Sequence, residues 1–210
     1  MQIICNECEK FGMKFESSHL KSPQDFIEGN PNSKIWIIGL NPKTDGKEVL
    51  NPTLEDLRNF KLDDKKKSNY FKDFKKVSEK LYNKWEGNVA HTDLVKCGSQ
   101  SFPPILDNKK GAEIIINNCM SKHLEFQIKK HKPKLIICNG APTSYAIFNQ
   151  FKPIDKNITS PKEIGAYKTE YNEHTFTVIL TGFIGRIDDW SKRRLGIDIE
   201  KNIDELKIEL

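Results

Sequence analysis

The chain has 210 residues, of which 37% are hydrophobic and 30% charged, and its formal net charge is +5. This length suits one domain over residues 1–210 with its own core, and no apolar run approaches the roughly 20 residues that cross a bilayer. The stretch from Met1 to Cys8 lacks the charged and apolar regions of a secretory signal, so a soluble cytoplasmic protein is expected. The basic charge is compatible with an anionic partner.

Four apolar runs predict buried strands, because each is short, rich in β-branched residues and followed by a turn signal. In chain order they are Ile35 to Gly39, Val89 to Val95, Lys134 to Cys138, and Phe176 to Leu180. Strands that alternate with helices are typical of a parallel sheet covered on both faces. The predicted fold class is therefore α/β, a three-layer α/β/α sandwich around a central, mostly parallel four-stranded sheet.

Helical periodicity fills the intervals between these strands. Apolar residues recur at helical spacing before the second strand and before the third: Tyr70, Phe74, Val77 and Leu81, then Ile115, Cys119, Leu124 and Ile128. A third helix is expected after Gly140, and another in the tail from Asp188 to Leu210. The polar segments Lys43 to Lys67 and Phe151 to Glu173 are interpreted as surface loops.

Ligands of such sheets bind beyond the carboxyl ends of the strands, so the functional site is expected just after each of the four predicted strands. Runs of positive charge, such as Lys65 to Lys67 and Lys192 to Arg194, lie elsewhere in the chain. These runs are more typical of solvated faces than of binding sites.

The spacing of the cysteines indicates a metal site more than disulfides, which are rare in a reducing compartment. Cys5 and Cys8 form a Cys-x-x-Cys pair, and Cys97 and Cys119 follow in the middle of the chain. Four thiolates suit an iron–sulfur cluster and suit tetrahedral zinc equally. Unligated thiols are the alternative for all four. Cys138 lies inside an apolar strand and is interpreted as a buried thiol outside this group.

The run Lys34-Ile-Trp-Ile-Ile-Gly-Leu-Asn-Pro42 joins the first predicted strand to a turn. It resembles the first motif of the mismatch-specific and single-strand-selective uracil glycosylases, Gly-Ile/Met-Asn-Pro-Gly. A tight turn at a strand end can present backbone N–H groups to a flipped base, while the Asn side chain holds the attacking water. The alternative is that Asn41 and Pro42 serve only as turn residues.

A longer stretch, from Val89 to Gly140, resembles the family 4 uracil-DNA glycosylases. It contains His91-Thr-Asp-Leu-Val-Lys-Cys97, a Pro103-Pro104 loop, Cys119 followed by Leu124, Gln127 and Ile128, and Pro133-Lys-Leu-Ile-Ile-Cys-Asn-Gly140. Between the two motifs, Ser68-Asn-Tyr-Phe-Lys-Asp-Phe74 resembles a helix start of the mismatch-specific branch. The chain thus resembles the uracil-DNA glycosylase superfamily, with a family 4 body and a first motif from another branch.

The resemblance implies an enzyme that hydrolyses the N-glycosidic bond of uracil or another deaminated base in DNA, acting as a monomer. It implies that Asn41 positions water, and that Gly39, Leu40, Pro42 and Phe71 contact the substrate. It also implies a four-iron four-sulfur cluster on the cysteines that family 4 uses, which fall here on Cys5, Cys8, Cys97 and Cys119; zinc is the alternative.

Asp93 stands where family 4 has the Asn that reads uracil. An ionised carboxylate only accepts hydrogen bonds, so Asp93 fits the N–H of uracil and repels the neighbouring carbonyl oxygen. Deaminated purines are then expected to compete with uracil or to exceed it. A solvated residue at the end of a strand is the alternative interpretation of Asp93.

The last family motif, His-Pro-Ser or Asn-Pro-Ser, is absent after Thr181, where the chain reads Gly182-Phe-Ile-Gly-Arg186. Arg186 is a candidate to stabilise the negative charge of the leaving base, and otherwise contacts phosphate or the surface. Phe183 is a candidate wedge in DNA, or packs inward. Because two motifs are altered, a protein that binds nucleic acid or nucleotide without catalysis stays open, as does a metal-stapled structural domain.

Overall fold

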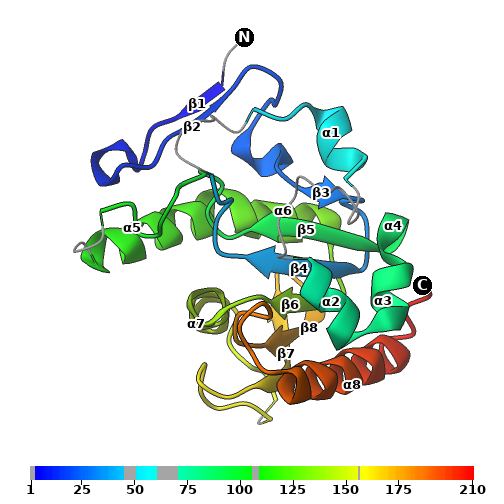
Figure 1. Cartoon of the computed structure of the whole chain (residues 1–210). Coiled ribbons are helices and arrows are strands. Elements are labelled where there is room, and N and C mark those ends of the chain that lie inside the picture. Colours follow the sequence, from blue (N-terminus) through cyan, green and yellow to red (C-terminus); the bar gives the residue numbers. More distant parts are fainter. Residues whose placement is uncertain (1–2, 45–50, 61–70, 106–108, 156) are drawn as a thin grey trace.

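The computed structural model describes residues 3–44, 51–60, 71–105, 109–155 and 157–210. A central sheet lies between two layers of helices, and a small N-terminal hairpin lies at one end of the domain (Figure 1). The predicted α/β class and the mostly parallel sheet are confirmed. The predicted number of strands is wrong, because the sheet has six strands in the order β3-β5-β4-β6-β8-β7. No described helix is both long and apolar enough to cross a membrane.

The sheet strands are β3 (Glu28–Gly29), β4 (Ile35–Gly39), β5 (Val89–Asp93), β6 (Leu135–Cys138), β7 (Gly165–Tyr171) and β8 (His174–Leu180), and the hairpin is β1 (Ile3–Cys5) with β2 (Phe15–Ser17). The helices are α1 (Leu54–Arg58), α2 (Lys72–Val77), α3 (Glu79–Asn83), α4 (Trp85–Asn88), α5 (Lys109–Cys119), α6 (Glu125–His131), α7 (Ala141–Gln150) and α8 (Asp189–Glu205). Short 3-10 turns η1 (Glu9–Phe11) and η2 (Pro23–Asp25) and a π-helical turn η3 (Met120–Leu124) complete the elements.

The two strands that the sequence did not reveal lie at the edges of the sheet and pair antiparallel with their neighbours. Within β7, buried Tyr167 and Thr169 alternate with exposed Lys168 and Glu170, so the strand has no continuous apolar run. This strand overturns the prediction of a surface loop over 151–173. The other edge strand, β3, has only two residues, which is too short for any periodicity to show.

Each face of the sheet carries its own apolar core. On one face, Trp36 and Ile38 pack with residues of η3, α6 and α7. On the other face, Ile35 and Ile37 pack with residues of α2, α3 and α8. Alternate residues of a strand point to opposite faces, so the parity of each position decides which helices its side chain meets.

The predicted helices form, with one interruption. Ser78 has extended backbone angles, divides α2 from α3, and caps α3 by accepting a hydrogen bond from the N–H of Leu81 at 3.1 Å. The helical segment before β6 runs unbroken from α5 through η3 into α6. Several predicted residues lie outside the described ones: Tyr70, residues 45–50 and 61–67 of the predicted loop, and Ser68 and Asn69 of the quoted motif. Within the described part of that loop, α1 forms.

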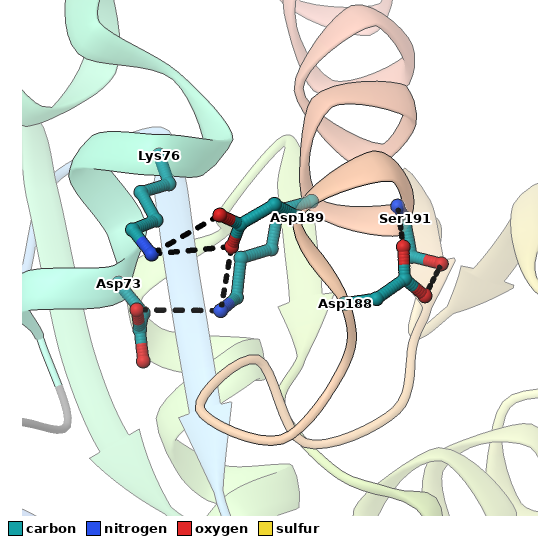
Figure 2. A network of polar contacts seen from close by, with 6 residues as sticks. Asp73, Lys76, Asp188, Asp189 and Ser191 are labelled. Carbon is teal, nitrogen blue, oxygen red and sulfur yellow. Dashed lines mark hydrogen bonds and ion pairs between the residues drawn. The ribbon is translucent and has the colours of Figure 1, made fainter.

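Helices α2 and α8 lie against each other at close range. A Cβ added at Gly196 of α8 would lie 1.8 Å from the carbonyl oxygen of Val77 in α2, so only glycine fits this crossing. Lys76 of α2 pairs with Asp189 of α8 (Figure 2), with Nζ 3.2 Å from a carboxylate oxygen. Nζ of Lys192 lies 3.3 Å from a carboxylate oxygen of Asp73. This contact fixes the start of α2 and the turn before α8 relative to the sheet.

Candidate functional site

The turns after β4 and β5 run side by side beyond the carboxyl end of the sheet. Within the strands, Gly39 pairs with Asp93 in parallel register. The alignment continues past both strands, because the N–H of Val95 donates to the carbonyl of Leu40 at 2.9 Å and the N–H of Ser99 donates to that of Pro42 at 3.1 Å. The first motif and the Asp93 segment, far apart in sequence, therefore form one wall.

Hydrogen bonds hold the side chain of Asn41 in a single orientation. Its Nδ2 donates to the backbone oxygen of Pro42 at 3.1 Å and to Oγ of Ser99 at 2.9 Å. A carbonyl oxygen only accepts, so the amide nitrogen must face it and Oδ1 must face away. No described residue donates to this Oδ1, so the turn after β4 carries an acceptor that a ligand or water can use.

Asp93 ends β5 as a buried carboxylate, with 5% of its surface exposed. Within the described part of the chain its side chain has no hydrogen-bond donor, although buried carboxylates ordinarily have partners. Burial raises the pKa of Asp93 to about 6, while the positive charges of His91 and Lys96 oppose that shift. A buried, unpartnered carboxylate is disfavoured in the protein alone, which makes Asp93 a candidate ligand-binding residue.

His91 and Phe71 lie on the sheet face to which Asp93 points, and His91 precedes Asp93 by two residues in β5. The ring centroids of His91 and Phe71 are 5.0 Å apart and nearly perpendicular, and Phe71 begins α2. Nδ1 of His91 lies 2.8 Å from Oε2 of Glu28. Burial alone would lower the pKa of His91, but the hydrogen bond to Glu28 and the nearby carboxylates outweigh it and raise the pKa.

Asn139 follows β6 at the same end of the sheet and was not predicted from the sequence. Its backbone N–H donates to Ile38 at 2.8 Å, and its Oδ1 accepts from the N–H of Ile184 at 2.8 Å. Its Nδ2 is buried, and no described residue accepts from it. A polar residue directly after a buried strand was the available signal, because ligands of such sheets bind beyond the carboxyl ends of the strands.

Phe183 and Arg186 lie in the turn between β8 and α8. The Arg186 guanidinium lies 5.9 Å from the centre of the Phe183 ring, and both side chains are exposed. Among the described residues, no hydrogen bond or ion pair links Arg186 to Asn41 or Asp93. The structure thus brings Gly39, Leu40, Asn41, Pro42, Asp93 and Phe71 to one end of the sheet, and holds Arg186 over Phe183.

Lys96 is buried between this end of the sheet and the cysteines. Its Nζ donates to Oγ1 of Thr92 and to Oε1 of Gln127, each at 2.7 Å, and to the backbone oxygen of Asp93. Burial lowers the pKa of Lys96 to about 7. These three acceptors show why a lysine is tolerated there, and its charge favours the ionised form of Asp93.

The four predicted metal ligands line one cavity between the N-terminal hairpin and α5. Cys5, Cys8, Cys97 and Cys119 surround about 250 Å³ of empty space, counting its open mouth, together with Met13 and other residues. Within the described ranges, no three His, Cys, Asp or Glu side chains converge closely enough to hold a single metal ion. The cavity thus gathers four thiols without a tetrahedral single-ion arrangement.

The surroundings of these sulfurs fit a bound cationic group. Nδ2 of Asn118 lies 3.5 Å from Sγ of Cys8, and Nε2 of His123 lies 4.0 Å from Sγ of Cys5. Burial raises the pKa of Cys119 to about 11, partly offset by the backbone N–H of Lys96, and burial with the neighbouring sulfurs raises that of Cys97 further. Four thiolates therefore need a metal centre to be stable together, and donors directed at sulfur are typical of such centres.

A model of the uracil-DNA glycosylase superfamily matches residues 26–182, about three quarters of the chain. The chain belongs to the uracil-DNA glycosylase superfamily. A comparison with curated proteins finds no match. Membership in this superfamily supports DNA glycosylase activity, hydrolase chemistry and DNA as the partner.

The superfamily match contains the turn at Asn41, the strand end at Asp93, and two of the four cysteines, Cys97 and Cys119. It begins after Cys5 and Cys8 and ends at Gly182, before the turn that carries Phe183 and Arg186. The family 4 branch and its cluster therefore stay predictions. The site residues that the sequence pointed to are now located, and their roles are proposed below.

Proposed function

We propose that this protein is a monofunctional DNA glycosylase that removes a flipped, deaminated base by hydrolysis. The observation that carries the proposal is the pairing of Gly39 with Asp93. It joins the family turn at Asn41 to a buried carboxylate that has no hydrogen-bond donor among the described residues. A site of this kind can hold one base edge at the strand ends, where α/β sheets bind ligands. Excision of a base from a flipped nucleotide is the chemistry of the superfamily to which the chain belongs.

In the proposed reaction, a water oxygen forms a bond to C1′ of the sugar as the bond from C1′ to the base nitrogen breaks. The base leaves with that electron pair, and the proton released by the water returns to the base through solvent. Asn41 supplies the acceptor that orients the water, because its Nδ2 donates to Pro42 and Ser99 while no described residue donates to its Oδ1. Phe71, beside His91, supports one side of the base site.

The exposed turn after β8 is proposed to contact DNA. Phe183 has 36% of its surface exposed and carries the Arg186 guanidinium over its ring. An aromatic ring with an adjacent cation suits insertion beside a base step and contact with phosphate. Arg186 is also the proposed source of positive charge for the leaving base.

We also propose that Cys5, Cys8, Cys97 and Cys119 hold a four-iron four-sulfur cluster. When bound, the cluster supplies a structural link between the N-terminal hairpin, the segment after β5, and the end of α5. Support comes from the common cavity, from the donors directed at two of its sulfurs, and from the cost of ionising buried thiols without a metal. Protein purified without oxygen should be brown and contain iron and sulfide; zinc alone would indicate a zinc site.

The test of the activity uses purified protein and single- and double-stranded oligonucleotides that carry uracil, hypoxanthine or xanthine. Alkaline cleavage at abasic sites reports excision, and undamaged DNA is the control. Excision of at least one deaminated base is expected. Binding to these oligonucleotides without excision would instead favour a nucleic-acid-binding protein. The exposed position of Arg186 and the missing last motif are the two observations that favour this alternative.

A further inference from the structure

Three neighbouring strands place Asp93, Gly39 and Asn139 in one row at the carboxyl edge of the sheet. Gly39 pairs with Asp93, and Ile38 pairs with Cys138, so Asn139 is the next position beside Gly39. The bond from the N–H of Asn139 to Ile38 continues this register. Because Gly39 has no side chain, β4 adds nothing between the two polar side chains.

Both polar side chains of the row point to the same face of the sheet. The residues two positions before Gly39 and Asn139, Ile37 and Ile137, belong to the core under α2 and α8. His91, two positions before Asp93, contacts Phe71 on that face. Side chains alternate along a strand, so Asp93 and Asn139 face the same layer.

One hydrogen bond fixes the orientation of the Asn139 amide and leaves its nitrogen without an acceptor among the described residues. Its Oδ1 must face the N–H of Ile184, at 2.8 Å, since only an oxygen can accept that bond. Its Nδ2 is then a donor, in a residue that is 2% exposed, with no acceptor among the residues described. A buried donor without an acceptor destabilises the protein, and a ligand acceptor at this point would remove that cost.

Two strand spacings of about 4.8 Å separate the Asp93 and Asn139 backbones by roughly 9.6 Å. If the side-chain atoms keep this separation, two hydrogen bonds of about 2.9 Å leave roughly 4 Å for the two ligand atoms between them, which is enough for adjacent N–H and C=O groups of one heterocycle. The row thus offers an acceptor and a donor on opposite sides of a gap.

We propose that Asp93 and Asn139 together read the base, Asp93 accepting from its ring N–H and Asn139 donating to the adjacent carbonyl. This inference rests on the proposed glycosylase function and names its substrate class, bases with a lactam edge such as uracil and hypoxanthine. Cytosine and adenine reverse both groups, so each would meet two like partners. Asn139 also supplies the donor that Asp93 alone cannot give.

The test compares Asn139→Asp with Asn149→Asp, a control that adds the same charge on an exposed part of α7. Asn139→Asp keeps an acceptor for Ile184, removes the donor and adds a negative charge. We expect kcat/KM on uracil and hypoxanthine to fall about 10- to 100-fold, and to change less than about 2-fold in the control. Asn139→Ser adds no charge and is expected to show the same loss, so it replaces the Asp variant if that variant folds poorly.

Binding of free hypoxanthine and uracil, measured by calorimetry on each variant, separates the two proposals. If the wild type excises bases and both Asn139 variants keep its rates, Asn139 does not read the base and the glycosylase function stands. If the wild type excises nothing but binds the free bases, and the variants lose that binding, the reading of the base stands without the activity. If the wild type neither excises nor binds a base, both proposals are overturned.

Discussion

Replacement of Asp93 by Asn should stabilise the protein at neutral pH, because it removes a buried charge at nearly constant shape. Burial raises the pKa of Asp93 from 3.8 to about 6, with the attraction of His91 and Lys96 already opposing the shift. A pKa raised this far corresponds to a cost on the order of 3 kcal/mol for the ionised form in the folded state. We expect the unfolding free energy of Asp93→Asn to exceed that of the wild type by on the order of 2 kcal/mol at pH 7.5.

The sign of the pH dependence follows from the raised pKa. Between pH 3.8 and about 6 the folded state binds the Asp93 proton more tightly than the unfolded state, so acid stabilises the wild type through this group. This contribution grows by on the order of 1 kcal/mol between pH 7.5 and pH 5, and the advantage of the variant should shrink by a similar amount.

Urea denaturation of both proteins at the two pH values measures these differences, and the exposed Asp204→Asn serves as control with a change below about 0.5 kcal/mol. A variant less stable than the wild type at pH 7.5 would refute the reasoning. That result would mean that the carboxylate has a stabilising partner. A stable variant with altered excision would identify Asp93 as a residue kept for function at the expense of stability.

Three further substitutions test other parts of the structure. Asn41→Ala should lower the excision rate at least about 100-fold with an unchanged melting temperature, and a wild-type rate would reduce Asn41 to a turn residue. Gly196→Ala should lower the unfolding free energy by about 1–3 kcal/mol, since its Cβ would lie 1.8 Å from the Val77 oxygen; a more stable variant in urea would contradict this crossing. Cys97→Ser should reduce bound iron to well below the wild-type content, and full iron content would remove Cys97 from the ligand set.

The central part of the fold could be predicted from the sequence because its signal is local. The strands β4 and β6 are buried on both faces and appear as continuous apolar runs. Buried apolar residues also mark β5 and β8, where polar residues stand among them. An edge strand has no such run: β7 alternates Tyr167 and Thr169 with charged residues, and only its pairing with β8 reveals it. The break at Ser78 was equally hidden, because the apolar spacing continues across it.

Within the candidate site, the sequence by itself determined Asn41, Asp93 and the cysteine set, because motifs and spacing identify residues one segment at a time. The tertiary structure decided how they combine. The register of β5, β4 and β6 sets Asp93 and Asn139 in one row. The N–H of Ile184, in the turn after β8, donates to Oδ1 of Asn139 and so fixes the orientation of that amide. Which polar atoms keep a partner depends on contacts between segments distant in sequence, so no local pattern could mark Asn139 as the donor left free.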